Sequence, residues 1–303
     1  MSGKPRVGYL GPEGTFSEEA LLASADADAV EPVPLASIYD TVMALRRGDV
    51  DWSVVPIENS LEGSISVTLD LLAGQASDVE IVGEALLRVR HSLIASEAIA
   101  LEEIDTVLTH PQVPGQCARF LRGELAHAQI VPASSTAEAV RTVAGDRGAE
   151  GDERRAALGT LLAAQIYGGT VLREGVQDRD DNETRFVWLA RAQDRSDAGP
   201  PPLREPPGEE WKTSIVFWGP GAEHAGWLVR CLDEFARRDI NLTKIESRPR
   251  PGRLGSYMFF ADLSGRPAET AVADAIAGVR ALCEEVRVLG SYRAGHDPQP
   301  RSD

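Results

Sequence analysis

The residue types best suited to chemistry stand together in the stretch DDNETRFVWLAR, residues 180–191. This stretch begins acidic and loop-like and then becomes an apolar run of the kind that forms a buried strand. Thr184 and Arg185 stand where the pattern changes. Strands rarely open with a hydroxyl beside a guanidinium, that is, a hydrogen-bond donor beside a group that pairs with anions. The pair is therefore a candidate site in a chain without a recognisable metal or nucleotide motif.

Three other groups of polar residues follow predicted strands. They are Glu58, Asn59 and Ser60 in PIENSLEGSISVT, Thr109, His110 and Gln116 in THPQVPGQC, and Ser134, Ser135 and Thr136 in PASSTAEAV. Several hydroxyl-rich helix starts that each follow a strand predict a cleft lined by helix N-termini, which is where open α/β sheets bind ligands. Helix N-termini carry a partial positive charge, so such a cleft suits a small carboxylate even in an acidic protein. For each residue the alternative is ordinary helix capping.

The segment GYLGPEGTFSEEA places Gly8, Gly11 and Gly14 between a predicted strand and a predicted helix. A dinucleotide fingerprint requires G-x-G-x-x-G, and a P-loop requires lysine after its last glycine, where this chain has Thr15. We therefore expect no nucleotide here. The segment instead predicts a tight turn at a helix start, with Thr15 and Glu18 spaced as a capping box.

Metal binding is not expected from the histidines or the cysteines. The five histidines are scattered without the spacing of a metal site, and His110 could equally be an acid or base or a residue that shapes a turn. Cys117, Cys231 and Cys283 are odd in number and far apart in sequence, which predicts small buried hydrophobic residues in a reducing cytosol. We expect neither a metal nor another cofactor.

Composition narrows the class of protein further. The chain has 303 residues, 43% of them hydrophobic, and a net charge of −16, so nucleic acid and anionic membranes are not expected partners. The N-terminal sequence lacks the apolar region of a signal peptide, and no apolar run reaches the roughly 20 residues of a membrane span. These features predict a cytoplasmic protein.

The chain divides at a stretch rich in proline and charge. Before residue 192, short strands alternate with helices, which predicts an α/β domain with a surface loop at 145–155. Residues 192–210, AQDRSDAGPPPLREPPGEE, predict a stiff solvated linker. The order βαββαβ over 211–292 predicts a ferredoxin-like module. Residues 293–303 form a tail that we expect to be disordered after Gly295.

Taken together, these motifs resemble the prephenate dehydratase family. The segments that carry the resemblance are GYLGPEGTFSEEA, VVPIENSLEGSISVTLDLL, HPQVPGQC, SSTAEAV, AALGTLLAAQIYG and NETRF. The last module resembles an ACT regulatory domain through INLTKIESRP. The resemblance covers about residues 5–292.

The resemblance implies a fold and a reaction. The catalytic region, 1–191, would have two lobes like a type 2 periplasmic binding protein: a first lobe of about 1–76 plus 175–191, and a second of about 77–174. The ACT domain would follow the linker at 211–292. The family reaction converts prephenate to phenylpyruvate, water and carbon dioxide in L-phenylalanine biosynthesis, without a cofactor.

The resemblance also implies roles for residues of the NETRF motif. Thr184 would be the essential group, acting on the ring hydroxyl that leaves. Because a threonine hydroxyl is too weak an acid to give up its proton alone, we expect a positioned donor or a proton relay. Arg185 would bind or steer a substrate carboxylate. Phe186 would pack within its strand or against the substrate ring.

Residues of the other motifs complete the expected site. Glu58, Asn59 and Gln116 would take part in catalysis. Thr109 would contact the substrate where the family has a serine. Ser60, Thr15 and Ser135 would be carboxylate or scaffold contacts.

The last module implies an effector site for L-phenylalanine between two ACT domains, and hence a homodimer or homotetramer. The expected contacts are Gly226, Trp227 and Leu228, in place of a Gly-Ala-Leu motif, and Glu246, Ser247, Arg248 and Pro249. The tryptophan could point at the ligand and alter its binding, or pack at the subunit interface.

Two alternatives remain open from the sequence. A dehydrogenase with an ACT domain would need a dinucleotide loop, which the glycine spacing does not provide. A non-catalytic sensor of small carboxylates on a binding-protein fold would keep the helix-start anion site but would not need Thr184.

Overall fold

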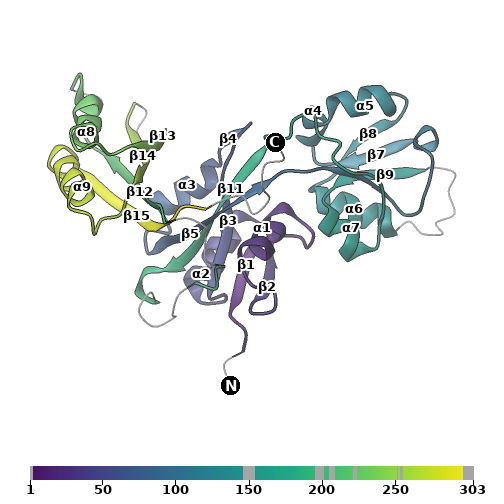
Figure 1. The fold of residues 1–303 in the computed structure, drawn as a ribbon, viewed down its shortest axis with the longest axis horizontal. Coiled ribbons are helices and arrows are strands. Elements are labelled where there is room, and N and C mark those ends of the chain that lie inside the picture. Colours follow the sequence, from purple (N-terminus) through teal and green to yellow (C-terminus); the bar gives the residue numbers. More distant parts are fainter. Residues whose placement is uncertain are drawn as a thin grey trace.

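The structure is a computed structural model that describes residues 3–145, 154–194, 201–204, 209–220, 224–250, 252 and 255–295. Most of the expected loop at 145–155 and the expected tail after Gly295 lie outside these residues. Within the described part of the chain, two sheets with helices packed against them form an α/β fold. Figure 1 shows one lobe around each sheet and a further pair of helices at the end opposite the second lobe.

The first lobe forms at the centre of the molecule from two separate parts of the sequence. Its elements are β1 (Arg6–Leu10), α1 (Phe16–Ser24), β2 (Glu31–Leu35), α2 (Ile38–Arg47), β3 (Trp52–Asn59), β4 (Gly63–Ser64), α3 (Ser66–Ala73), β5 (Val79–Arg88) and β11 (Glu183–Arg191). The strand order is β5-β11-β3-β1-β2, so the late strand β11 lies between two early ones. β11 is antiparallel to both neighbours, which brings the NETRF segment beside the PIENS segment.

The second lobe is a continuous excursion of the chain between β5 and β11. Its elements are β6 (Ser92–Ala95), β7 (Thr106–Thr109), α4 (Val113–Gln116), α5 (Ala118–Glu124), β8 (Gln129–Pro132), α6 (Thr136–Gly145), β9 (Arg155–Gly159), α7 (Leu161–Tyr167) and β10 (Thr170–Arg173). The strand order is β10-β6-β9-β7-β8. Apolar clusters cover both faces of this sheet, one with α5 and the other with α6 and α7.

The C-terminal module has the expected order βαββαβ. Its elements are β12 (Trp211–Trp218), α8 (Trp227–Ala236), β13 (Leu242–Pro249), β14 (Tyr257–Ser264), α9 (Thr270–Leu282) and β15 (Glu285–Arg293). Alternate residues of its strands pack in two directions. Ile215 and Phe217 pack beneath α8 and α9, whereas Val216, Met258 and Phe260 share a core with the first lobe. The module therefore docks on the first lobe with the face of its sheet that lacks helices.

Two expected boundaries differ from the structure. We expected β5 in the second lobe, but it pairs with β11 along nine residues in the first sheet, because its apolar side chains join that core. The linker was expected to be solvated throughout, but Leu203 packs on the first lobe and the Arg204 N–H donates to the Ser24 carbonyl at 2.8 Å.

The cysteines are free and two of them are close in space. Cys117 and Cys231 are buried and Cys283 is half-buried. The Sγ atoms of Cys231 and Cys283 are 3.7 Å apart, although the residues are distant in sequence. The buried positions of Cys117 and Cys231 agree with the expectation that the cysteines pack as small hydrophobic residues.

Candidate active site

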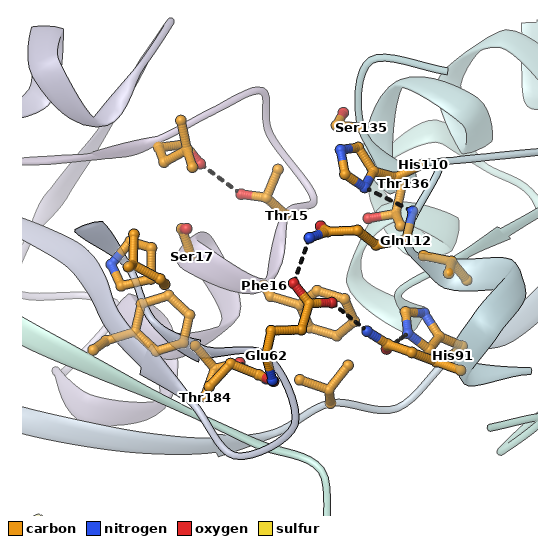
Figure 2. Close-up of a pocket in the computed structure, with 18 of the residues that line it drawn as sticks. Thr15, Phe16, Ser17, Glu62, His91, His110, Gln112, Ser135, Thr136 and Thr184 are labelled. Carbon is orange, nitrogen blue, oxygen red and sulfur yellow. Dashed lines mark hydrogen bonds between the residues drawn. The ribbon is translucent and has the colours of Figure 1, made fainter. Parts of the chain in front are cut away.

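A pocket of about 470 Å³ lies between the two lobes, where the ends of strands from both sheets meet helix starts. Figure 2 shows its polar side chains converging from both sides. Of the residues expected in the site, Thr184, Asn59, Gln116, Phe186, Thr15 and Ser135 line this pocket, as does His110. The cleft lined by helix starts that the sequence predicted therefore exists as a cavity.

Helix N-termini supply the positive potential of this pocket. Thr15 caps α1, accepting from the Glu18 N–H at 3.4 Å and donating to the Leu10 carbonyl at 2.9 Å. Ser135 accepts from the Glu138 N–H at 3.0 Å at the start of α6. Among the described residues that line the pocket there is no lysine or arginine. Both hydroxyls thus cap helices and line the pocket, so helix capping and a place in the site do not exclude each other for these residues.

The orientation of the Thr184 hydroxyl is set by Asn59, its partner on the neighbouring strand β3. Asn59 Oδ1 accepts from the N–H groups of Leu61 and Glu62 at 2.9 and 3.0 Å, which fixes the direction of the amide. Asn59 Nδ2 then donates to Thr184 Oγ1 at 3.0 Å. Because that oxygen already accepts a hydrogen bond on this side, the Thr184 proton is free to point into the pocket.

Gln116 and Asn182 extend this hydrogen-bonded chain across to the second lobe. Asn182 Oδ1 accepts from Asn59 Nδ2 at 2.9 Å, and Asn182 Nδ2 donates to Gln116 Oε1 at 3.1 Å. The same Gln116 oxygen lies 3.0 Å from His91 Nε2, which must be the donor. The chain thus runs from His91 through Gln116, Asn182 and Asn59 to Thr184.

His91 enters this chain as a neutral ring. It is almost fully buried, and its Nδ1 has no hydrogen-bond partner among the described residues. Burial lowers the pKa of His91, partly opposed by its hydrogen bond with Gln116. A neutral ring with the proton on Nε2 directs the Gln116 amide nitrogen away from itself, toward the middle of the pocket.

Glu62 occupies the middle of the pocket in Figure 2. Its carboxylate accepts from Gln116 Nε2 at 3.1 Å and from Gln112 Nε2. These two amides come from the second lobe, so Glu62 of the first lobe bridges the cleft. Sequence reasoning missed Glu62, His91 and Asn182. Asn182 could have been found, because it lies in the segment DDNETRF, two residues before Thr184.

Two residues expected in the site lie on the opposite face of the sheet. Glu58 and Arg185 are neighbours of Asn59 and Thr184, so strand alternation turns their side chains away from the pocket. Arg185 donates to Glu84 at 2.7 Å and to Asp262 at 2.5 Å, and Glu58 pairs with Lys244 at 2.9 Å. The expected contact of Arg185 with a substrate carboxylate is wrong for this geometry, and so is a direct catalytic contact of Glu58.

Ser60 and Thr109 are also outside the lining of the pocket. The exposed Ser60 hydroxyl donates to the Asp181 carbonyl and accepts from the Glu183 N–H at 2.9 Å, which fixes the turn after β3 against β11. The buried Thr109 hydroxyl donates to the Leu158 carbonyl at 3.1 Å, between β7 and β9. Both hydroxyls are scaffold groups here, since their donors and acceptors are used within the protein.

His110 lines the pocket, and its Nδ1 accepts from the Gln112 N–H at 3.5 Å. This contact shapes the turn that leads into α4. It favours the turn-forming interpretation of His110 over that of an acid or base.

A smaller pocket of about 360 Å³ lies on the C-terminal module and is lined by Gly226, Trp227 and Leu228. Trp227 is buried, packs against Phe217 and Phe259, and donates from Nε1 to the Leu282 carbonyl at 2.7 Å. Its ring therefore forms part of the module core and also borders the pocket.

The second group of expected effector contacts lies on β13, away from this pocket. Glu246 accepts from Ser64 at 3.2 Å, and Arg248 donates to Asp70 at 2.6 Å, so both side chains face the first lobe. Ser247 and Pro249 are exposed on the other face of the strand. One chain therefore brings only Gly226, Trp227 and Leu228 together at the pocket.

Two features are absent from the part of the chain that the structure describes. No group of three or more histidine, cysteine, aspartate or glutamate residues there could hold a metal ion. None of the helices there is long and apolar enough to cross a membrane.

Comparison with known proteins gives a consistent picture. A model of the prephenate dehydratase family matches residues 7–194. The prephenate dehydratase of Mycobacterium sp. (strain KMS) is 40% identical over 99% of this chain and 93% of its own length. That of Amycolatopsis methanolica is 38% identical, over 95% of this chain and 88% of its own.

Solved structures agree with these relatives. The prephenate dehydratase from Arthrobacter aurescens in complex with L-Phe has a TM-score of 0.81 and 34% identity, over 95% of this chain and 89% of that one. GqqA, described as a novel type of quorum quenching acylase, has a TM-score of 0.78 and 26% identity, over 96% of this chain and 98% of that one. On the family match and the full-length relatives, the chain belongs to the prephenate dehydratase family.

Proposed function

We propose that the pocket between the lobes is where this chain converts prephenate to phenylpyruvate, with Thr184 as the group that assists the leaving hydroxyl. The observation that carries the proposal is the fixed polarity of the Thr184 hydrogen bonds. Asn59 donates to the hydroxyl oxygen, so the hydroxyl proton is available to a substrate oxygen in the pocket. A neutral donor held in this way stabilises negative charge that develops during a reaction.

The reaction needs little more than this donor. The bond between the ring and its carboxylate breaks, and its electron pair moves through the ring as the C–O bond to the hydroxyl breaks. Carbon dioxide leaves, the ring becomes aromatic, and the departing hydroxide takes one proton, supplied in net by the solvent, to become water. Because aromatisation supplies the driving force, the barrier lies in the poor leaving group. The Thr184 hydrogen bond acts there, and the Asn59 N–H supports the Thr184 oxygen as charge develops.

The substrate carboxylates would be held without a cationic side chain. The starts of α1 and α6 point partial positive charge into the pocket, and the amides of Gln112 and Gln116 offer N–H donors. In the structure these amides donate to Glu62. A substrate carboxylate that takes them must displace Glu62, since two anions at one pair of donors repel each other.

We extend the proposal to the architecture of the chain. The two lobes, 1–191, form a catalytic region like the type 2 periplasmic binding proteins, and residues 211–292 form an ACT regulatory domain after the linker. The order βαββαβ and the pocket beside Trp227 support the second assignment. The reaction on a free small metabolite fits the cytoplasmic location that the sequence predicts.

The effector would be L-phenylalanine, bound between two copies of the module in a homodimer or homotetramer. The similar structure from Arthrobacter aurescens contains L-Phe. β13 is an edge strand of the sheet, with Ile245 48% exposed beside Ser247. Such an edge can pair with a second copy, which would bring the missing β13 contacts to the pocket beside Trp227.

The test is to incubate the purified chain with prephenate and to follow the absorbance of phenylpyruvate, with and without a chelator. We expect turnover that the chelator does not change, and turnover lost in Thr184→Val but largely kept in Thr184→Ser, which retains the hydroxyl. A wild-type chain that binds prephenate without converting it would support the alternative of a small-carboxylate sensor and refute the enzymatic proposal.

A further inference from the structure

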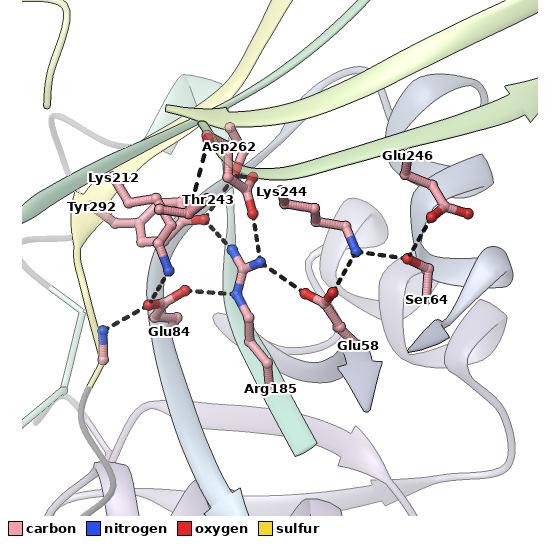
Figure 3. Close-up of polar contacts among 12 residues, drawn as sticks. Glu58, Ser64, Glu84, Arg185, Lys212, Thr243, Lys244, Glu246, Asp262 and Tyr292 are labelled. Atoms are coloured by element: carbon pink, nitrogen blue, oxygen red, sulfur yellow. Dashed lines mark hydrogen bonds and ion pairs between the residues drawn. The ribbon is translucent and has the colours of Figure 1, made fainter. Parts of the chain in front are cut away.

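Arg185 lies at the centre of a buried group of charges between the first lobe and the C-terminal module (Figure 3). Its Nε donates to Glu84 at 2.7 Å, Nη1 donates to Asp262 at 2.5 Å, and Nη2 donates to the Tyr292 hydroxyl at 2.7 Å. Lys212 donates to the other oxygen of Glu84, and Lys244 pairs with Glu58. We call these seven residues the Arg185 cluster.

The cluster is balanced in charge, and its centre is shielded from water, whereas Glu58 at its edge is 35% exposed. Three cations, Arg185, Lys212 and Lys244, face three carboxylates, Glu58, Glu84 and Asp262. The side chains of Glu84, Asp262 and Arg185 are 1%, 7% and 9% exposed. Burial alone would lower the pKa of Arg185, but Tyr292, Asp262 and Glu84 outweigh it and keep the guanidinium charged.

Every bond of Arg185 to Asp262 and Tyr292 crosses from the first lobe to the module. Arg185 stands on β11, whereas Asp262 stands on β14 and Tyr292 on β15. Apolar contacts such as those of Val216 and Phe260 also hold the two parts together. Those contacts are non-directional, whereas a buried guanidinium with three fixed partners specifies one docked arrangement.

The same cluster is attached to the groups that orient the catalytic hydroxyl. Arg185 follows Thr184, and Glu58 precedes Asn59, and these four residues pair across β11 and β3. The register of that pairing shifts just after Arg185, where Ile57 of β3 has no partner on β11, whereas Arg185 itself pairs with Glu58 on β3 and Leu86 on β5. A displacement of the guanidinium or of the Glu58 carboxylate is therefore passed to the Thr184–Asn59 pair through one peptide unit on each strand.

The cluster is also attached to the pocket of the module. β14 carries Asp262 in the cluster and Tyr257 and Phe259 in the pocket lining, five and three residues away. β13 carries Lys244 in the cluster and Glu246 two residues further along. A ligand in the module pocket thus contacts a strand whose other end holds Arg185.

We propose that Arg185 is a positioning residue that holds Thr184 through β11, and that the Arg185 cluster couples ligand occupancy in the module to the catalytic pocket. The inference rests on the proposed function. The coupling arises if the ligand favours a docked arrangement in which Asp262 and Tyr292 hold the guanidinium differently. The charge of Arg185 then serves the docking of the two parts, and substrate binding is left to neutral donors.

The experiment compares Tyr292→Phe and Asp262→Asn with the wild-type chain. For each protein, prephenate turnover is measured with and without saturating L-phenylalanine, and calorimetry gives the affinity for L-phenylalanine. We expect L-phenylalanine to change wild-type turnover by a factor of about 5 to 150. In both variants we expect that factor to fall to within about twofold of unity, with the affinity for L-phenylalanine retained.

Arg287→Gln is the matched control. Arg287 Nη2 also crosses from the module to the first lobe, but it donates to the Leu72 carbonyl at 3.1 Å and to the Ala73 carbonyl, both at the end of α3, and not to β3 or β11. This variant weakens docking without touching the cluster and should keep the full response. Circular dichroism and a melting curve establish that each variant is folded. If Asp262→Asn does not fold, Tyr292→Phe still tests the inference, because it keeps the packed ring.

The outcomes separate the inference from the proposed function. Absence of turnover in the wild-type chain would refute the proposed function. Wild-type turnover that responds to L-phenylalanine, together with an unchanged response in Tyr292→Phe, would overturn the inference alone. Loss of the response in Arg287→Gln as well would also overturn it, because docking strength and not the cluster would then carry the effect.

Discussion

On one face of β11, Thr184 and Phe186 line a pocket whose described lining contains no lysine or arginine, whereas on the other face Arg185 lies among Glu58, Glu84 and Asp262. Consecutive residues of the strand, Thr184 and Arg185, point to these two faces. The pocket would bind an anion with helix N-termini and neutral amides. The opposite face uses full charges to hold two parts of the chain together.

The comparison teaches that a charged residue in a functional motif need not touch the ligand. A full positive charge beside Thr184 would stabilise the substrate carboxylate that is lost as carbon dioxide, and an interaction at least as strong in the ground state as in the transition state does not accelerate the chemical step. A hydroxyl with fixed polarity would instead act on the charge that develops during the reaction.

Arg185→Leu should cost about 3–5 kcal/mol of unfolding free energy, because it leaves Glu84 and Asp262 buried without their cation. Urea denaturation measures the loss. The control is Arg47→Leu, which removes the exposed pair with Asp49 and should cost far less. Equal stability of the two variants would contradict the structural role assigned to Arg185.

Thr184→Val should lower kcat by roughly a hundredfold, or about 3 kcal/mol of barrier, while the KM for prephenate changes less. The substitution keeps the shape of the side chain and removes its donor. Steady-state kinetics with prephenate measure both constants, and Thr184→Ser should stay much closer to wild type. Near wild-type turnover in the valine variant would show that the hydroxyl does not assist the reaction.

Glu19→Gln tests how much a buried carboxylate lowers the free energy of unfolding when no neighbouring cation stabilises its charge. Burial raises the pKa of Glu19 to about 7, although the Leu162 N–H donates to it, and Glu18 raises it further. Between about pH 4.5 and 7 the folded chain keeps a proton that the unfolded chain loses, so stability falls as the pH rises.

The glutamine variant should therefore gain up to about 3 kcal/mol at pH 8 and show a flatter dependence of stability on pH across that window. Denaturation curves at pH 5 and pH 8 measure this, with Glu97→Gln as a surface control. An unchanged slope would mean that Glu19 ionises normally in the folded chain.

Asp78→Asn should change the unfolding free energy by less than about 1 kcal/mol. Asp78 accepts two hydrogen bonds from Arg46 at 2.6 and 3.0 Å, and these bonds lower its pKa, but its side chain is 55% exposed. Water already solvates both charges there. A loss as large as that of Arg185→Leu would show that burial is not what distinguishes the Arg185 cluster.

Much of this molecule could be predicted from local pattern. The alternation of strands and helices, the βαββαβ order after the linker, and the helix starts at Thr15 and Ser135 are all present in the structure. Two helices were missed, α2 and α7, although Ser37 and Thr160 cap them and Gly48 and Gly168 end them in the left-handed region. Residues 113–124 form two short helices that meet at Cys117, and Val113, Cys117 and Leu121 pack in the same apolar cluster.

The candidate site was predicted in part. Thr184, Asn59 and Gln116 were placed in the pocket correctly, whereas Glu58, Arg185, Ser60 and Thr109 were not. Strand alternation alone would have turned Arg185 away from Thr184. What lies behind the strand could not be inferred, because Asp262 and Tyr292 come from a module more than 70 residues further along the chain.

Most of the elements, the family and the hydroxyl at the start of β11 follow from local pattern, because helix caps, strand alternation and motif order are local properties. Which charges meet depends on the packing of distant segments. Insertion of β11 between β5 and β3, and docking of the module on the reverse face, bring residues from four strands of the module around one guanidinium. A buried charge takes its role from the partners that fold around it, and those partners are fixed by packing over long sequence separations.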